Sequence, residues 1–124
     1  MMSAAEKESD REERIDMEIV VDAYDMEERE MGWFYYLDDK ITFPFTAECY
    51  TTDTRSPLLL GEQVVVSGMV YKDEWQGQDM YVEISWNNRT LSVPLAQLKP
   101  LSTDDDTLEA VEDWHYWKRR GYEF

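Results

Sequence analysis

The stretch MYVEISWNNRTLSVPL, residues 80–95, decides the fold because it predicts a β-hairpin. Its first half has apolar residues at every second position, which is typical of a strand with one buried face. Asn87 and Asn88 follow, and asparagine tolerates the positive φ that a two-residue hairpin turn requires. Alternate apolar residues from 91 to 95 predict the returning strand.

Two further strands are expected before this hairpin. Residues 43–50 form the first, although Pro44 confines it to a sheet edge or places the proline at the strand start. Residues 63–70, after a turn at Gly61, form a β-branched second strand, and residues 96–98 predict one short helical turn. Four or five short strands in meander order predict a small, curved antiparallel β-barrel of the Src-homology-3 type.

A helix is expected before the strands. Ser9 and Glu12 make a capping-box pattern, and Ile15 and Ile19 then recur at helical spacing. The alternation of apolar residues from 17 to 21 leaves a strand open as the rival interpretation. Flanking charges and the cap favour the helix.

Two more segments complete the predicted architecture. The most aromatic stretch, MGWFYYL at residues 31–37, should supply much of the core and closes before residues 38–40. A C-terminal helix is capped by Ser102 or Thr103 and ends before Gly121. Its inward-facing residues are expected to be Leu108, Val111, Trp114 and Trp117. The predicted class is therefore α+β, a barrel flanked by N-terminal and C-terminal helices, in one domain (residues 9–124) after a disordered tail (residues 1–8).

Composition limits the function. Apolar residues make up 43% of the 124, which is enough for a real core. With 12 basic and 28 acidic residues the net charge is −16, which disfavours nucleic acids and anionic membranes and favours cations or basic protein patches. No apolar run approaches the length of a membrane span, so a cytoplasmic protein is expected.

Few catalytic groups are available. The single cysteine, Cys49, allows no internal disulfide and is expected to be a buried small hydrophobe. The single histidine, His115, excludes multi-histidine metal sites and the usual zinc sites. Phosphate loops, nucleophile elbows and metalloprotease motifs are absent from the sequence, so we expect no enzyme.

Carboxylates are the abundant reactive groups, and hard oxygen ligands indicate Ca²⁺ or Mg²⁺. The calcium loop of a helix–loop–helix hand does not occur. Asp38 and Asp39 follow the aromatic segment, where a helix end would add unpaired carbonyl groups as ligands. Adjacent acids at the negative end of a helix are unfavourable, and a bound cation would remove that conflict. An exposed polar turn is the alternative for this pair.

A second candidate cation site lies in the loop before residue 80. Asp73, Glu74 and Asp79 surround Gly77 and could wrap an ion with side chains and carbonyls. A solvated hairpin tip is the alternative. The acidic run at residues 104–106 is better explained as helix capping.

Five segments in order carry a resemblance to a known family. They are RIDMEIVVDAY (14–24), MGWFYYL (31–37), FPFTA (43–47), VPLAQL (93–98) and EDWHYW (112–117). The chain resembles the cyanobacterial calcium-binding protein family typified by CcbP. The resemblance implies a compact protein that binds Ca²⁺ through surface carboxylates, without helix–loop–helix hands, and sequesters cytosolic calcium. It transfers a ligand role to Asp38 and Asp39 only, whereas the loop at residues 73–79 rests on its own residues.

The leading prediction is a cytosolic calcium buffer or sensor with one tight site and room for a weaker second ion. The runner-up is an acidic interaction module, independent of metal, that docks a protein partner through exposed rings such as Trp75, Tyr81 or Tyr116. A hydrolase built on two carboxylates is a third possibility, but the sequence offers no substrate pocket for it.

Overall fold

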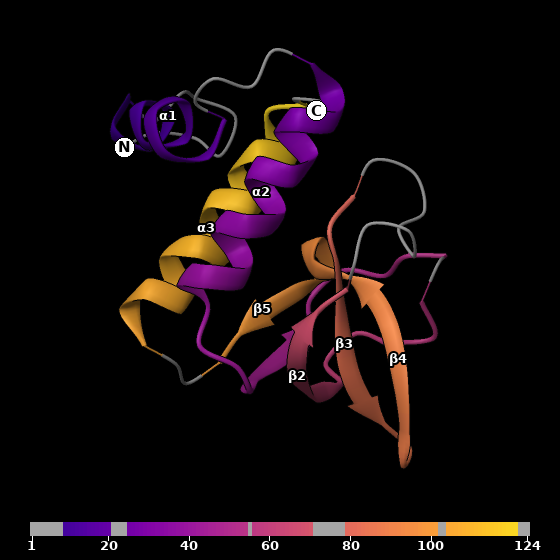
Figure 1. Cartoon of the computed structure of the whole chain (residues 1–124). Helices are drawn as coiled ribbons and strands as arrows, with labels where there is room; N and C mark the ends of the chain where they lie inside the picture. Colours follow the sequence, from indigo (N-terminus) through magenta and orange to yellow (C-terminus); the bar gives the residue numbers. More distant parts are fainter. Residues whose placement is uncertain (1–8, 21–24, 55, 71–78, 102–103, 122–124) are drawn as a thin grey trace.

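The computed structural model describes residues 9–20, 25–54, 56–70, 79–101 and 104–121. The predicted tail (residues 1–8) lies outside these ranges. In the view of Figure 1, two helices pack side by side across the centre, the sheet lies at lower right and α1 at upper left. The elements are α1 (Ser9–Arg14), η1 (Ile15–Ile19), α2 (Met26–Lys40), β1 (Phe45–Cys49), β2 (Gln63–Met69), β3 (Tyr81–Trp86), β4 (Arg89–Pro94), η3 (Leu95–Gln97), β5 (Leu98–Pro100) and α3 (Asp105–Arg119).

The five strands form one antiparallel sheet in the order β4-β3-β2-β1-β5. Asn87 and Asn88 have φ of 51° and 61°, which confirms the predicted hairpin turn. Residues 95–97, rather than 96–98, make the short helical turn, and β5 begins at Leu98. Since β4 and β5 are the two edges and do not pair across the described residues, the sheet is open. The α+β class and the meander are confirmed, but the Src-homology-3-type barrel is not.

The N-terminal segment is helical, which settles the choice between helix and strand for residues 9–19. The α-helix α1 continues into one wider π-helical turn, η1. Ile15 and Ile19 are both buried in the core, as the helical spacing predicts.

The helices α2 and α3 begin with aspartate caps. Asp25 accepts a hydrogen bond from the Glu28 amide at 2.8 Å, and Asp104 accepts one from the Thr107 amide at 3.1 Å. The cap expected at residues 102–103, which lie outside the described ranges, was therefore wrong. Gly121, with φ of 74°, follows the end of α3 and confirms the predicted stop signal.

Aromatic rings form the contact between α2 and α3. Trp33 packs edge-on against Trp114, with 5.0 Å between ring centroids, and lies 5.4 Å from the Trp117 ring. The aromatic stretch therefore supplies the core as expected, and Cys49 is buried as expected.

Three predictions about exposure were wrong. Leu108, expected inside, is 37% exposed, because it lies on the side of α3 that lines an open cavity shared with α1 and β5. Tyr81 and Tyr116, proposed as exposed docking rings, are buried, and Trp75 lies outside the described residues. None of the helices in the described ranges combines the length and apolar character needed to cross a bilayer.

Candidate metal centre

Asp38 and Asp39 lie in the last turn of α2, and both side chains are exposed. The helix ends where the Ile41 amide donates to the Leu37 carbonyl at 3.0 Å. Carbonyl groups in the last turn of a helix have no partner within the helix and carry partial negative charge. The predicted coincidence of two adjacent acids with a helix C-terminus is therefore confirmed.

The first turn of α3 lies beside the last turn of α2 because the two helices run antiparallel (Figure 1). The Thr42 amide, just after α2, donates to the Thr107 hydroxyl at 2.9 Å. Thr107 in turn donates from its hydroxyl to the capping Asp104 at 2.7 Å. These bonds fix the acidic start of α3 next to the acidic end of α2.

An open groove of about 1040 Å³ occupies this junction. Four carboxylates line it, from η1, from α2 and from α3. The lining residues are Glu18, Ile19, Gly32, Tyr35, Tyr36, Asp38, Asp39, Lys40, Thr42 and Asp106. The groove therefore gathers acids that are up to 88 positions apart in the sequence.

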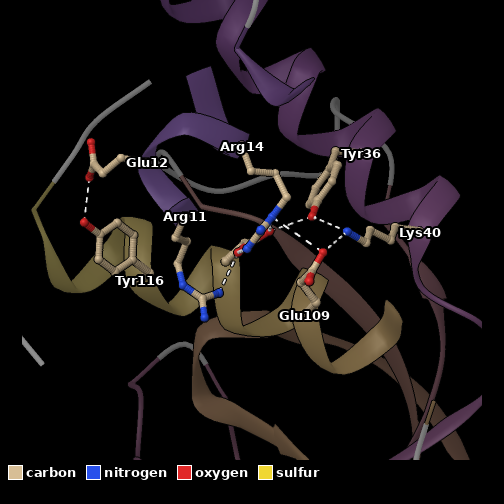
Figure 2. Close-up of polar contacts among 8 residues, drawn as sticks. Arg11, Glu12, Arg14, Tyr36, Lys40, Glu109 and Tyr116 are labelled. Carbon is tan, nitrogen blue, oxygen red and sulfur yellow. Dashed lines mark hydrogen bonds and ion pairs between the residues drawn. The ribbon is translucent and has the colours of Figure 1, made fainter. Parts of the chain in front are cut away.

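Lys40 is the basic residue of this groove, but its ammonium group is engaged elsewhere. It donates to Glu109 and, at 3.1 Å, to the Tyr36 hydroxyl (Figure 2). Burial lowers the pKa of Lys40, but the bonds to Glu109 and Tyr36 outweigh that effect and raise the pKa overall. Lys40 therefore stays charged, and Glu109 compensates its charge.

Tyr36 connects Lys40 to a carboxylate inside the protein. Its hydroxyl donates to Asp113, which is fully buried, at 2.6 Å. Arg11 and Arg14 also donate to this carboxylate, at 2.6 and 2.7 Å. Burial and the bond to Asp113 raise the pKa of Tyr36 to about 12. The bond to Asp113 also raises the pKa of Arg14.

Only part of the predicted ligand set meets in the groove. Asp38 and Asp39 come together with Glu18 and Asp106, which the sequence analysis did not single out as ligands. Glu18 belongs to a segment predicted as a helix with a strand as the rival interpretation, and Asp106 belongs to a run assigned to helix capping. The antiparallel pairing of α2 and α3 is the missing information, and no local sequence signal encodes it.

The second predicted cluster is placed differently. Asp79 is buried, 2% exposed, and its carboxylate lies 3.6 Å from the Lys118 ammonium group. Lys118 is twelve residues after Asp106 on α3, or about 18 Å along the helix axis. The structure therefore does not bring Asp79 to the groove. Asp73 and Glu74 lie outside the described residues, and their ligand role stays a prediction.

The donor chemistry of the groove fits a hard divalent cation. Carboxylates, the Thr42 hydroxyl and helix-terminal carbonyls are all oxygen donors, which Ca²⁺ takes six to eight at a time. Within the described ranges, no three acidic, histidine or cysteine side chains are close enough to hold a metal by themselves. The coordination shell of an ion bound here would therefore be completed by main-chain oxygens and water, or by carboxylates that turn toward the ion.

Comparison with known proteins shows which family this chain belongs to. The family model described as calcium binding, that of CcbP, matches residues 13–118. The crystal structure of Anabaena CcbP is 41% identical to this chain, with a TM-score of 0.85 over 99% of this chain and 100% of that one. A structure of a calcium binding protein in the calcium-binding form is 40% identical, with a TM-score of 0.83 over the same shares. No curated protein matches the chain. Because the family model covers most of the sequence, the chain belongs to the CcbP family of calcium-binding proteins, and Ca²⁺ is its ion.

Proposed function

We propose that this protein binds Ca²⁺ in the groove between the end of α2 and the start of α3 and acts as a calcium buffer in the cytosol. The observation that carries the proposal is the convergence of Asp38, Asp39, Glu18 and Asp106 on one groove. The binding uses no helix–loop–helix hand, and the proposal assigns the protein no catalytic step.

Electrostatics supports a cation at this place. The C-terminal end of α2 carries a partial negative charge, and Asp38 and Asp39 add two full charges to it. In a chain of net charge −16 the surrounding field raises the local concentration of cations. A divalent ion bound at the end of α2 relieves the repulsion between the adjacent Asp38 and Asp39 carboxylates, so binding should also stabilise the fold.

The shape of the groove favours calcium over magnesium. It is wide, open and lined by oxygen donors from separate elements. Ca²⁺ accepts irregular arrangements of many oxygens, whereas Mg²⁺ demands near-octahedral geometry and releases its water reluctantly. A loosely arranged donor set therefore selects the larger ion.

A buffer is favoured over a sensor because hydrogen bonds connect the walls of the groove to each other. The Thr42 amide donates to the Thr107 hydroxyl, and the Lys40 ammonium group donates to Glu109. An ion that neutralises carboxylates on such a frame has little freedom to move the helices. We expect amide chemical-shift changes on calcium addition to stay within residues near the groove. Changes that spread through the sheet would support a sensor instead.

The test is a calorimetric calcium titration of the full chain and of Asp38→Asn combined with Asp39→Asn. The control variant, Asp10→Asn combined with Glu13→Gln, removes the same two charges from exposed positions of α1. We expect saturable binding to the wild type, at least tenfold weaker binding to the groove variant, and a change below twofold in the control. Mg²⁺ should bind more weakly than Ca²⁺ throughout.

Calcium should also raise the melting temperature, because a ligand at about 100 times its Kd stabilises the folded state by about 2.7 kcal/mol. An equal loss of affinity in the groove variant and the control would mean that the general acidic field, rather than the groove, holds the ion. A flat titration of the wild type would contradict the proposal altogether.

A further inference from the structure

A second cavity of about 430 Å³ lies between α1, the outer face of α3 and β5. Apart from the loop residue Tyr50, its lining comes from these three elements, and it shares no residue with the acidic groove. The lining residues are Arg11, Tyr50, Lys99, Pro100, Leu108, Val111, Glu112, His115 and Arg119. We call this cavity the cationic cleft.

The lining of the cleft is mainly basic, whereas the molecule as a whole is acidic. Three basic residues, Arg11, Lys99 and Arg119, line it together with one carboxylate, Glu112. The whole chain has only 12 basic residues against 28 acidic ones, so a quarter of all its basic residues meet here. The lining therefore has three basic residues to one acidic residue, the reverse of the balance in the whole chain.

The two guanidinium groups of the cleft both contact the Tyr116 ring. Arg11 lies 6.0 Å and Arg119 lies 5.9 Å from the centre of the Tyr116 ring, and both contacts are of the cation–π kind. Their charges therefore cannot be farther apart than the sum of these two distances. Both groups line the same cleft, and each has a planar fork that matches phosphate and carboxylate oxygens.

The position of the Arg11 side chain is fixed by a hydrogen bond to a buried carboxylate. Arg11 donates to the buried Asp113 at 2.6 Å, and its side chain is 19% exposed. Asp113 also accepts from Arg14, whose guanidinium group lies 3.5 Å from the Glu109 carboxylate as well. The docking of α1 on α3 thus fixes the position of the Arg11 guanidinium group at the edge of the cleft.

The remaining walls are apolar and aromatic. Leu108, 37% exposed on α3, lines the cleft together with Pro100 and Val111. Tyr50 stacks on His115, with 5.3 Å between ring centroids and an interplanar angle of 28°. Burial lowers the pKa of His115 to about 4, so its ring is neutral near pH 7 and adds a flat surface rather than a charge.

We infer that the cationic cleft binds a small organic anion, with a phosphate or carboxylate head between Arg11, Lys99 and Arg119 and a flat apolar body against Leu108 and the Tyr50–His115 stack. The volume suits a ligand of one ring and its head group, and the combination of a few placed polar groups with apolar walls is typical of small-molecule sites. The inference does not depend on the calcium site, which involves other residues.

The test is a titration of the isotope-labelled full chain in calcium-free buffer, followed by amide chemical shifts. The probes are phenyl phosphate, benzoate, inorganic phosphate and phenol. We expect phenyl phosphate or benzoate to give saturable shifts at residues 50, 99, 108 and 115, whichever head group the site prefers. Inorganic phosphate should bind more weakly for lack of the ring, and phenol should give no saturable shift.

Two variants and one control make the test specific. Arg119→Gln and Lys99→Gln each remove one charge from the cleft and should weaken binding of the better probe by about tenfold. Arg89→Gln removes the same charge from the exposed hairpin turn and should leave binding unchanged. Circular dichroism of each variant checks that the fold is intact.

Three results would overturn the inference. The first is the absence of saturable shifts with both aromatic anions. The second is phenol binding as strongly as phenyl phosphate, which would leave the charges without a role. The third is an equal loss of affinity in Arg89→Gln and in both cleft variants, which would reduce the effect to net charge.

Discussion

Gly32 stands in the middle of α2, where glycine is less favourable than alanine by about 1 kcal/mol. The structure gives the reason for a glycine there. A Cβ atom at this position would overlap the main-chain carbonyl oxygen of Ile19, which lies against the helix. The close approach of η1 to α2, and with it the position of Glu18 in the groove, therefore requires a residue without a side chain.

Gly32→Ala should destabilise the protein although alanine is the better helix former. Overpacking against a main-chain atom costs about 1–3 kcal/mol, which exceeds the gain in helix propensity. The measurement is the free energy of unfolding in urea. Gly68→Ala is the matched control, because a Cβ atom there meets nothing within 4 Å and should change stability little. A Gly32→Ala protein as stable as the wild type would contradict the close packing of η1.

The pH dependence of stability should depend on His115. Burial, with a smaller effect of Arg119, lowers its pKa from 6.5 to about 4 in the folded protein. The unfolded chain therefore binds the proton more readily, so this stabilisation is complete above pH 6.5 and is lost as the pH falls toward 4. From pH 7.5 to pH 5 the loss should be roughly 2 kcal/mol.

His115→Phe keeps a ring against Tyr50 and removes this titration. Urea unfolding at both pH values should show a smaller loss for the variant than for the wild type. Both proteins share the titration of the acidic residues, which therefore cancels in the comparison. An identical pH dependence for the two proteins would mean that His115 is not held neutral.

At the scale of elements, the N-terminal segment is attached to the helix pair by one buried carboxylate. Asp113 of α3 accepts from Arg11 and Arg14 of α1 and from Tyr36 of α2. The Tyr116 hydroxyl adds a bond to Glu12 at 2.7 Å. The segment contributes Arg11 to the cationic cleft and Glu18 to the acidic groove. Its attachment therefore shapes both candidate sites.

Asp113→Asn should loosen α1 and η1 before the rest of the protein. Loss of the buried charge leaves two arginines competing for a neutral acceptor, and breaking a buried ion pair costs about 3–5 kcal/mol. Hydrogen exchange should show faster exchange in residues 9–19 than in the wild type, while the sheet stays protected. Glu112→Gln, an exposed neighbour on the same helix, is the control with the same change in charge. Unchanged exchange in residues 9–19 would contradict this role of Asp113.

The elements that could be predicted are those with local signals. The Asn87–Asn88 turn, the stop at Gly121 and the helical spacing of Ile15 and Ile19 each act within a few residues. Caps were harder, since Ser, Thr and Asp are all good N-caps and the run before α3 offered several of them. The exposure of residues on α3 was also harder to predict, because the positions of Leu108 and Tyr116 in the sequence are compatible with more than one packing of the helix.

The groove could be predicted only in part because it forms between elements. Asp38 and Asp39 have a local signal, two acids where a helix ends. Glu18 and Asp106 join them through the antiparallel packing of α2 and α3 and the close approach of η1. Closure of the sheet is likewise a long-range property, and the strand pattern that suggested a barrel is equally compatible with an open sheet.

At the scale of the whole molecule, charge is unevenly distributed. The net charge of −16 favours cations over most of the surface, and four carboxylates line the groove at one end of the helix pair. Three basic residues meet in a separate cleft beside α1. The two candidate sites thus attract ligands of opposite charge to different parts of one small protein.

The most direct measurement of the central claim is a crystal structure of the protein grown with calcium, with the ion located by its anomalous scattering. The account predicts an ion in the groove, with an oxygen of Asp38 or Asp39 at about 2.3–2.6 Å and further oxygens from the groove completing its coordination. Calcium bound elsewhere, with both of these aspartates free of the ion, would contradict it.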